Sequence, residues 1–122
     1  MFDPARFVTN SAALPVETFD WGTLQWLCND RLLPGAEQTL GICHIHPGRA
    51  NPRHYHPNCD EVLHMISGCG QHSFGDNSVE LSAGMTIRIP SGVVHNMANP
   101  GTETIVCMIA FNAGERTTVF LD

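Results

Sequence analysis

Glycine and proline interrupt this chain at short intervals, and their spacing limits the folds that it can adopt. Turn residues recur at Pro34-Gly35, Pro47-Gly48, Ser67-Gly68, Gly75-Asp76-Asn77, Ser82-Ala83-Gly84, Pro90-Ser91-Gly92 and Asn99-Pro100-Gly101. The segments between them have strand-like composition and cover Gly22–Cys28, Gln38–His46, Arg53–His56, Glu61–Ile66, Gly70–Phe74, Ser78–Leu81, Met85–Ile89, Val93–Asn96, Thr104–Phe111 and Thr117–Leu121. Because no long segment has a 3.6-residue period, the pattern predicts an all-β sandwich or barrel.

The length of 122 residues predicts a single domain with its own hydrophobic core. Residues 1–20 differ from the rest of the chain. They contain isolated apolar residues and two prolines and show no sustained hydrophobic period. We therefore predict an N-terminal arm and first strand over residues 1–30, followed by a barrel domain over residues 31–122.

Composition argues against several classes of function. The formal net charge of −6 is unfavourable for a nucleic-acid surface, which needs clustered basic residues. All six basic residues are arginine, so Schiff-base chemistry on a lysine is excluded. No run approaches the ~20 apolar residues of a membrane span, and Met1–Asn10 lacks the pattern of a secretory leader. We expect a cytoplasmic protein that binds neither nucleic acid nor membrane.

Two clusters rich in histidine carry the clearest chemical signal. In the first, His54 and His56 project together, because side chains at i and i+2 of a strand share a face. Glu61 opens the next predicted strand, and an antiparallel return would bring it back beside both histidines. In the second, the turn at Pro90-Ser91-Gly92 presents His95 at the start of a strand. Three imidazoles and one carboxylate suit manganese, iron, cobalt, nickel, copper or zinc.

This ligand set leaves two kinds of metal site open. Around an ion that prefers six ligands, four protein ligands leave positions for substrate, water or O₂. A closed tetrahedral zinc site with the same ligands would be structural instead. We expect Leu63, Met65 and Met97 to form an apolar wall of the pocket, and His72 to face it.

The remaining histidines and the cysteines have simpler interpretations. His44 and His46 repeat the His-x-His spacing without a carboxylate at a matching distance, so we interpret both as structural. His64 falls on the strand face opposite Glu61. The five cysteines, an odd number without a Cys-x-x-Cys pair, argue against a disulfide framework. Cys59 lies between two candidate ligands, where a thiolate would compete for the metal.

Both clusters resemble, in residue type and in spacing, the two motifs of the cupin superfamily. The matching positions are Gly48, His54, His56, Glu61 and Gly68 in the first motif, and Gly84, Pro90, Gly92, His95 and Asn99 in the second. The resemblance implies an all-β cupin fold, a double-stranded β-helix or jelly-roll-like barrel, with three histidines and one glutamate holding a metal near one mouth. The first cluster looks like the germin and oxalate-decarboxylase branch, whose members often hold manganese. In that branch the position of Asn51 lies in the metal pocket.

Two classes of function fit these residues. The first is an enzyme with one divalent metal ion, manganese or iron by preference and nickel, copper or zinc otherwise. It would carry out oxidoreductase (dioxygenase-like) or lyase (decarboxylase) chemistry on a small carboxylate or enol-type molecule, with Asn51 orienting the ligand. The second is a non-catalytic binding or sensor module; a cupin isomerase or cyclase is a further alternative. No dedicated general base stands out, so the sequence leaves the reaction open.

The resemblance also implies a homodimer, because cupins commonly form dimers. The arm is the segment that we expect to contact a second subunit, since Phe2, Phe7 and Phe19 stand there among polar neighbours.

Overall fold

The computed structural model describes residues 1–121, nearly all of which form short strands and turns. Two short 3-10 helices come first, η1 (Pro4–Phe7) and η2 (Ser11–Ala13). The strands are β1 (Glu17–Phe19), β2 (Gly22–Cys28), β3 (Thr39–Ile45), β4 (His54–Tyr55), β5 (Glu61–Ser67), β6 (Cys69–Phe74), β7 (Asn77–Ser82), β8 (Thr86–Ile89), β9 (His95–Ala98), β10 (Ile105–Phe111) and β11 (Val119–Phe120).

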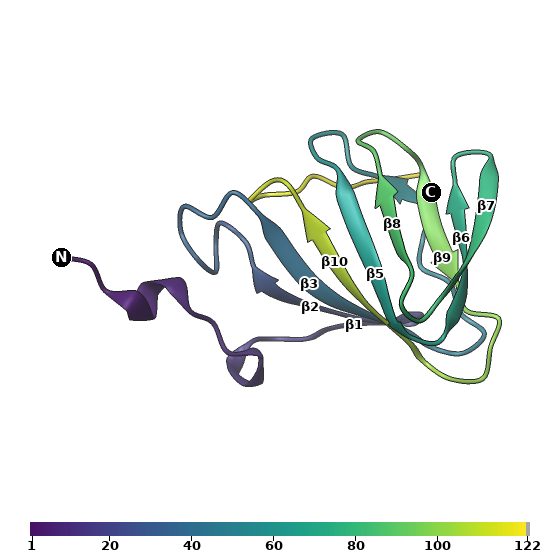
Figure 1. Cartoon of the computed structure of the whole chain (residues 1–122), viewed down its shortest axis with the longest axis horizontal. Helices are drawn as coiled ribbons and strands as arrows, with labels where there is room; N and C mark the ends of the chain where they lie inside the picture. Colours follow the sequence, from purple (N-terminus) through teal and green to yellow (C-terminus); the bar gives the residue numbers. More distant parts are fainter. Residues whose placement is uncertain (122) are drawn as a thin grey trace.

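The strands form two antiparallel sheets that make up the body of the molecule (Figure 1). One sheet has the order β1-β2-β3-β10-β5-β8 and the other the order β11-β4-β9-β6-β7. No strand pairing within residues 1–121 joins them into one continuous sheet, so the arrangement is jelly-roll-like rather than a closed barrel. The predicted all-β, jelly-roll-like fold is confirmed.

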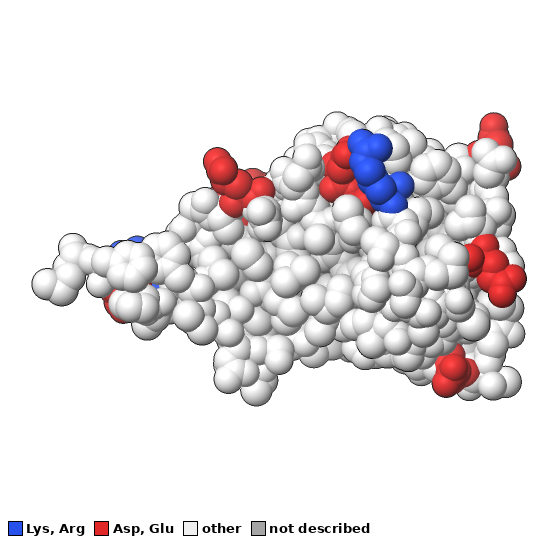
Figure 2. Space-filling model, in the orientation of Figure 1, with Lys and Arg blue, Asp and Glu red and all other residues white. Residues whose placement is uncertain are grey.

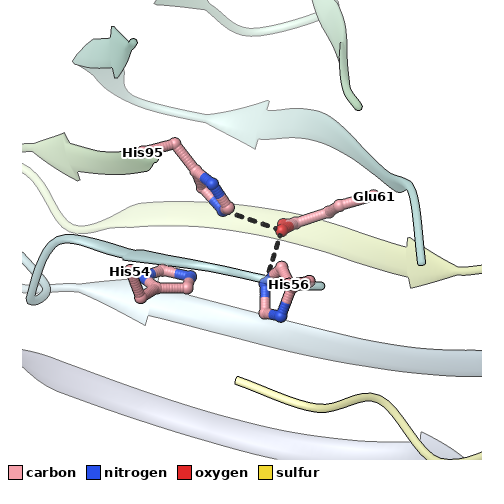
Figure 3. A group of neighbouring side chains, drawn as sticks. All are labelled: His54, His56, Glu61 and His95. Carbon is pink, nitrogen blue, oxygen red and sulfur yellow. Dashed lines mark hydrogen bonds and ion pairs between the residues drawn. The ribbon is translucent and has the colours of Figure 1, made fainter. Parts of the chain in front are cut away.

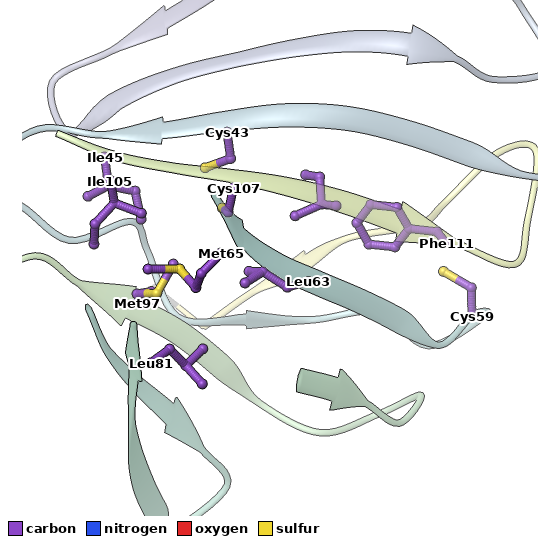
Figure 4. Packing of buried hydrophobic residues seen from close by; sticks show 11 residues of the cluster. Cys43, Ile45, Cys59, Leu63, Met65, Leu81, Met97, Ile105, Cys107 and Phe111 are labelled. Carbon is purple, nitrogen blue, oxygen red and sulfur yellow. The ribbon is translucent and has the colours of Figure 1, made fainter. Parts of the chain in front are cut away.

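The hydrophobic core lies between the two sheets (Figure 4). Along β10 every second residue is buried, as expected for a strand with one face on the core. The same alternation on β5 buries Glu61, Leu63 and Met65 while Val62 and His64 are exposed, which places the Glu61 carboxylate on the core side. The inner face of the fold therefore holds the metal-type cluster, the four candidate ligands His54, His56, Glu61 and His95.

The N-terminal region contains one strand that was not predicted. Residues 17–19 form β1, a short strand that pairs with β2, and β2 pairs in turn with β3. The sheet therefore includes strands from both sides of residue 30, and the predicted boundary there stays a prediction. Only the residues before β1 extend from the body, as the tapering projection in Figures 1 and 2.

The expected hairpin between β4 and β5 does not form. β4 pairs with β9 and β11, whereas β5 pairs with β10 and β8 in the other sheet. The chain crosses from one sheet to the other between residues 55 and 61, so Glu61 faces the histidines from the opposite sheet. This correction changes how the site is assembled, because the site bridges the two layers.

Charged side chains are sparse on the face in Figure 2, where isolated acidic groups outnumber basic ones. Within residues 1–121, the structure contains no helix long and apolar enough to span a membrane.

Candidate metal centre

Four side chains from both sheets converge on one point (Figure 3). His54 lies on β4, His95 opens β9, and Glu61 opens β5, while His56 directly follows β4. One ligand atom from each lies within 4.8 Å of the others, a spacing that could hold a single metal ion. The structure thus brings together all four residues that the sequence proposed as ligands.

Strand pairing and a turn fix the three histidines. His54 and His95 stand directly opposite each other in the β4–β9 register, which sets their rings side by side at 4.3 Å between centroids. Gly92 has a φ of +84°, a conformation that favours glycine, and its N–H donates to His56 O at 2.9 Å. The turn before His95 is thereby tied to the residue that follows β4.

Asp60 joins the second metal motif to the strand of Glu61. Its Oδ1 accepts the Ser91 N–H at 2.9 Å, and its Oδ2 accepts from Arg88 Nη2 at 2.6 Å. The Ser91 N–H, and then Arg88, hold the pKa of Asp60 below its usual range. Since Asp60 precedes Glu61, this contact fixes the carboxylate opposite His95.

Each histidine of the cluster donates Nδ1–H to a backbone carbonyl. The acceptors are Pro52 O at 2.8 Å for His54, Thr117 O at 3.0 Å for His56 and Val93 O at 2.9 Å for His95. A carbonyl can only accept, so the hydrogen lies on Nδ1 and the Nε2 lone pair of each neutral ring is left free. Metal-binding histidines in proteins are oriented by partners of this kind.

The free Nε2 atoms meet a carboxylate. His95 Nε2 lies 3.0 Å and His56 Nε2 lies 3.2 Å from Glu61 Oε1. The His56 contact lacks hydrogen-bond geometry, so Nε2 is a buried nitrogen without a hydrogen-bond partner within residues 1–121. A proton on His95 Nε2 fits its contact with the carboxylate, and a divalent metal in place of that proton would satisfy all three groups, including His56 Nε2.

Burial and the neighbouring charges set the protonation states of the candidate ligands. Burial alone would raise the pKa of Glu61, but the contacts with His56 and His95 outweigh it and lower the pKa to about 2. Burial, followed by the charge of His95, lowers the pKa of His54 to about 4. Burial also acts to lower the pKa of His95, yet Glu61 raises it above its ordinary value. At neutral pH the site therefore presents an ionised carboxylate and a neutral His54.

The cluster borders a cavity of about 80 Å³ between the sheets. Leu63, Met97 and His72 are among the residues that line it, while Met65 is fully buried in the core and is not part of the lining. His72 stacks on His95 at 5.7 Å, and its buried Nδ1 has no hydrogen-bond partner in the described part of the chain. Burial lowers the pKa of His72 to about 4, so its ring is neutral.

Asn51 also lines the cavity, on the side of β9. Its Oδ1 accepts the Met97 N–H at 2.8 Å, which fixes the side-chain amide. The Nδ2 group of Asn51 has no partner among the hydrogen bonds of residues 1–121 and can donate to a ligand.

The far wall of the cavity was not foreseen from the sequence. Trp26 of β2 and three residues of the C-terminal segment, Arg116, Thr118 and Phe120, contribute to the lining. The segment reaches the site because β11 pairs with β4, with Phe120 opposite His54. The alternate spacing of Arg116, Thr118 and Phe120 was the available signal, since residues two apart share one side of an extended segment.

Residues interpreted as structural lie apart from this centre. His44 is on the outer side of β3, and His46 and His64 are exposed. Cys59 is buried in the core but outside the four-residue cluster, and burial raises the pKa of its thiol. A protonated thiol does not compete with imidazole for a metal.

Comparisons with known proteins agree with this geometry. Residues 41–111 match the family model described as a cupin domain. The chain is 31% identical over 117 residues to Germin-like protein 3-8 of Oryza sativa subsp. japonica, covering 88% of this chain and 45% of the relative. It superposes on oxalate decarboxylase of Lactobacillus farciminis in a formate complex with a TM-score of 0.84 at 21% identity, covering 90% of this chain and 34% of that one.

Oxalate decarboxylase of Bacillus subtilis, a protein with Mn(II) centres, gives a TM-score of 0.79 at 20% identity, covering 85% of this chain and 29% of that one. The chain thus spans less than half the length of each of these three proteins. At these identities the two decarboxylases support the fold.

Proposed function

Because this chain belongs to the cupin family, we propose that it is a metal-dependent enzyme acting on a small carboxylate such as oxalate. The observation that carries the proposal is the convergence of His54, His56, Glu61 and His95 beside a small cavity. We propose manganese as the resident ion, since neutral imidazoles with one carboxylate suit it and a structural neighbour has Mn(II) centres.

The residues of this site have different proposed roles. The bound ion would supply Lewis-acid and one-electron chemistry of the oxidoreductase or lyase type. Glu61 offsets part of the cationic charge, and the three histidines offer Nε2 lone pairs held in place by backbone carbonyls. Asn51 Nδ2 is available to orient an oxygen of the ligand. The apolar and aromatic lining, including Leu63, Met97 and Phe111, keeps the cavity poor in water.

The test is turnover by manganese-loaded protein. Oxalate should be consumed, with CO₂, formate or O₂ uptake followed separately to distinguish decarboxylation from oxidation. Glu61→Gln should abolish turnover, whereas Glu80→Gln, on the exposed side of β7, should leave it unchanged. Absence of turnover with oxalate and with a panel of small 2-oxo and 2-hydroxy acids would overturn the enzyme proposal.

A non-catalytic binding module is the second candidate, and one observation favours it. Apart from the four metal-type residues, the titratable groups lining the cavity are His72, Arg116 and the buried thiols of Cys43 and Cys107. His72 is not poised to exchange protons near neutral pH, because burial lowers its pKa and keeps the ring neutral. Saturable oxalate binding without turnover would support this reading.

We also propose that the arm mediates a homodimer. Met1, Phe2, Phe7 and Val8 are all exposed, and the Phe2 and Phe7 rings stack on each other at 5.0 Å between centroids. An apolar arm of this kind is suited to cover a second copy of the chain. Light scattering should give a dimer mass for the whole chain and a monomer mass after removal of residues 1–16. An unchanged mass would contradict the proposal.

A further inference from the structure

Arg116 places a guanidinium on the far wall of the cavity. Its Cζ lies 4.1 Å from the centroid of the Trp26 ring and 5.4 Å from that of Phe111. All three residues line the same cavity as the metal-type cluster. Arg116 is therefore the cationic side chain of this cavity that is not itself a candidate metal ligand.

The charge of Arg116 has no anionic partner in the described chain. Of the three ion pairs within residues 1–121, two join His56 and His95 to Glu61 and the third joins Arg88 to Asp60. Burial lowers the pKa of Arg116, while the charges of Glu61 and Glu17 act against this. A guanidinium that is partly withdrawn from solvent and has no contacting carboxylate is available to form charge-assisted hydrogen bonds with an anionic ligand.

The guanidinium is held in a fixed orientation. Nη1 donates to Thr118 Oγ1 at 2.7 Å, and the ring beneath it is fixed by a bond of 3.0 Å from Trp26 Nε1 to Glu17 Oε1. One N–H of the five that arginine carries is used in this way, and the others have no acceptor among residues 1–121. A planar group with a free edge is arranged to bind a carboxylate through two parallel hydrogen bonds.

A short chain of contacts links Arg116 to the metal-type cluster. Thr118 Oγ1, which accepts from Arg116, also lies 3.3 Å from His56 Nδ1. Thr118 therefore lies between the guanidinium and the Nδ1 side of His56, and Arg116, Thr118 and His56 all line the same cavity. At about 80 Å³ the cavity admits a ligand of a few heavy atoms, since a cavity needs only about 10–15 Å³ to hold one water molecule.

We propose that Arg116 is the carboxylate anchor that selects small acids carrying a second oxygen group, such as dicarboxylates and 2-oxo acids. This inference rests on the proposed function, because it assumes that the other end of the ligand lies at the metal-type cluster. The competing explanation is that Arg116 only clamps the C-terminal segment onto Trp26.

The test is binding, measured by calorimetry on manganese-loaded protein. The probes are oxalate and oxamide, which have similar shapes but differ in charge. Wild type should bind oxalate at least tenfold more tightly than oxamide, and Arg116→Met should weaken oxalate binding at least tenfold while leaving oxamide within twofold. Arg116→Lys, which keeps the charge and loses the paired donors, should fall between wild type and Arg116→Met. Arg49→Met, at an exposed position, is the control for the loss of one positive charge.

A measurement on unaltered protein covers the case in which Arg116→Met does not fold. With diamagnetic zinc in place of manganese, the ¹⁵Nε–H resonance of Arg116 should shift on addition of oxalate and stay in place with oxamide. Oxalate binding that is unaffected by Arg116→Met, or an unshifted Arg116 resonance at saturating oxalate, would overturn the assignment. Binding that depends on Arg116 without turnover would overturn the enzyme proposal alone, so the two failures are distinguishable.

Discussion

Two His-x-His pairs occur in this chain, and the structure gives them opposite environments. His44 lies between Cys43 and Ile45 on β3, where both neighbours are buried and His44 points outward. His46 follows the strand and is exposed. Neither His44 nor His46 belongs to the group of candidate metal ligands that the structure brings together within residues 1–121.

The second pair has the same spacing and a different set of neighbours. His54 and His56 lie on the inner side of the fold, where β9 delivers His95 in register and β5 delivers Glu61 from the opposite sheet. His-x-His spacing therefore provides two metal ligands only when strand pairing turns both histidines inward and residues from distant strands complete the ligand set.

The largest effect is expected when the second pair loses its carboxylate. Glu61→Gln should weaken manganese binding by at least 100-fold, about 2.7 kcal/mol, because a neutral amide cannot offset the charge of the ion. The protein should stay folded, since the change is nearly isosteric. Competition titration with a metallochromic chelator measures the dissociation constant, with Glu80→Gln as the exposed control. If Glu61→Gln and Glu80→Gln bound manganese equally tightly, the Glu61 carboxylate would not be what distinguishes the two histidine pairs.

A smaller effect is expected at Asn99, a motif residue that the structure assigns to the scaffold. Its Nδ2 donates to Ile45 O and to Glu103 O, each at 2.9 Å, and its side chain is buried. Asn99→Ala should lower the free energy of unfolding by about 2 kcal/mol, because one buried and one partly buried carbonyl lose their donor. Manganese content should match wild type.

Urea unfolding and elemental analysis test this prediction together, with the exposed Asn77→Ala as control. Loss of metal from folded Asn99→Ala protein would instead give this residue a direct role in the centre.

The smallest effect concerns the pH dependence of metal-free protein. Burial, as the largest cause, lowers the pKa of both His54 and His72 from 6.5 to about 4. Between these values the unfolded chain binds more protons, so stability falls as the pH decreases through this window. His95 acts in the opposite direction, because its pKa is raised and its contribution is lost as the pH increases.

Replacing His72 should therefore make the unfolding free energy of the metal-free protein depend less steeply on pH. Between pH 6.5 and 5.5, His72→Phe should reduce the acid-induced loss of unfolding free energy by about 1 kcal/mol. His46→Phe, at an exposed position of the first pair, should leave the profile unchanged. Thermal unfolding across this range provides the comparison, and identical slopes for His72→Phe and wild type would contradict the burial argument.

The sequence predicted the strands well because turn residues are local signals. The expected segment Gly22–Cys28 coincides with β2, and the turn before His95 starts β9 as expected. β1 was missed because its three residues lie among irregular ones, and the β4–β5 hairpin was wrong because strand pairing between distant segments is not a local property. The four converging residues were identifiable from spacing and family resemblance.

The cavity wall was harder to predict. Arg116 and Thr118 reach the site through the pairing of β11 with β4, a contact between segments more than 60 residues apart. Met65 was assigned to the pocket because it shares the face of Glu61 and Leu63, yet it lies in the core beyond the cavity lining. The alternation of residues predicts which side chains face the core, but it does not predict how far along the strand the cavity extends.

The most direct test of the account is the manganese content of two double variants, His44→Ala/His46→Ala and His54→Ala/His56→Ala. Each protein would be loaded with manganese, dialysed and measured by elemental analysis, with circular dichroism to verify folding. We predict about one ion per chain for wild type and for the first variant, and close to none for the second. Retention of manganese by folded His54→Ala/His56→Ala protein, or its loss from His44→Ala/His46→Ala protein, would contradict the assignment of the metal centre.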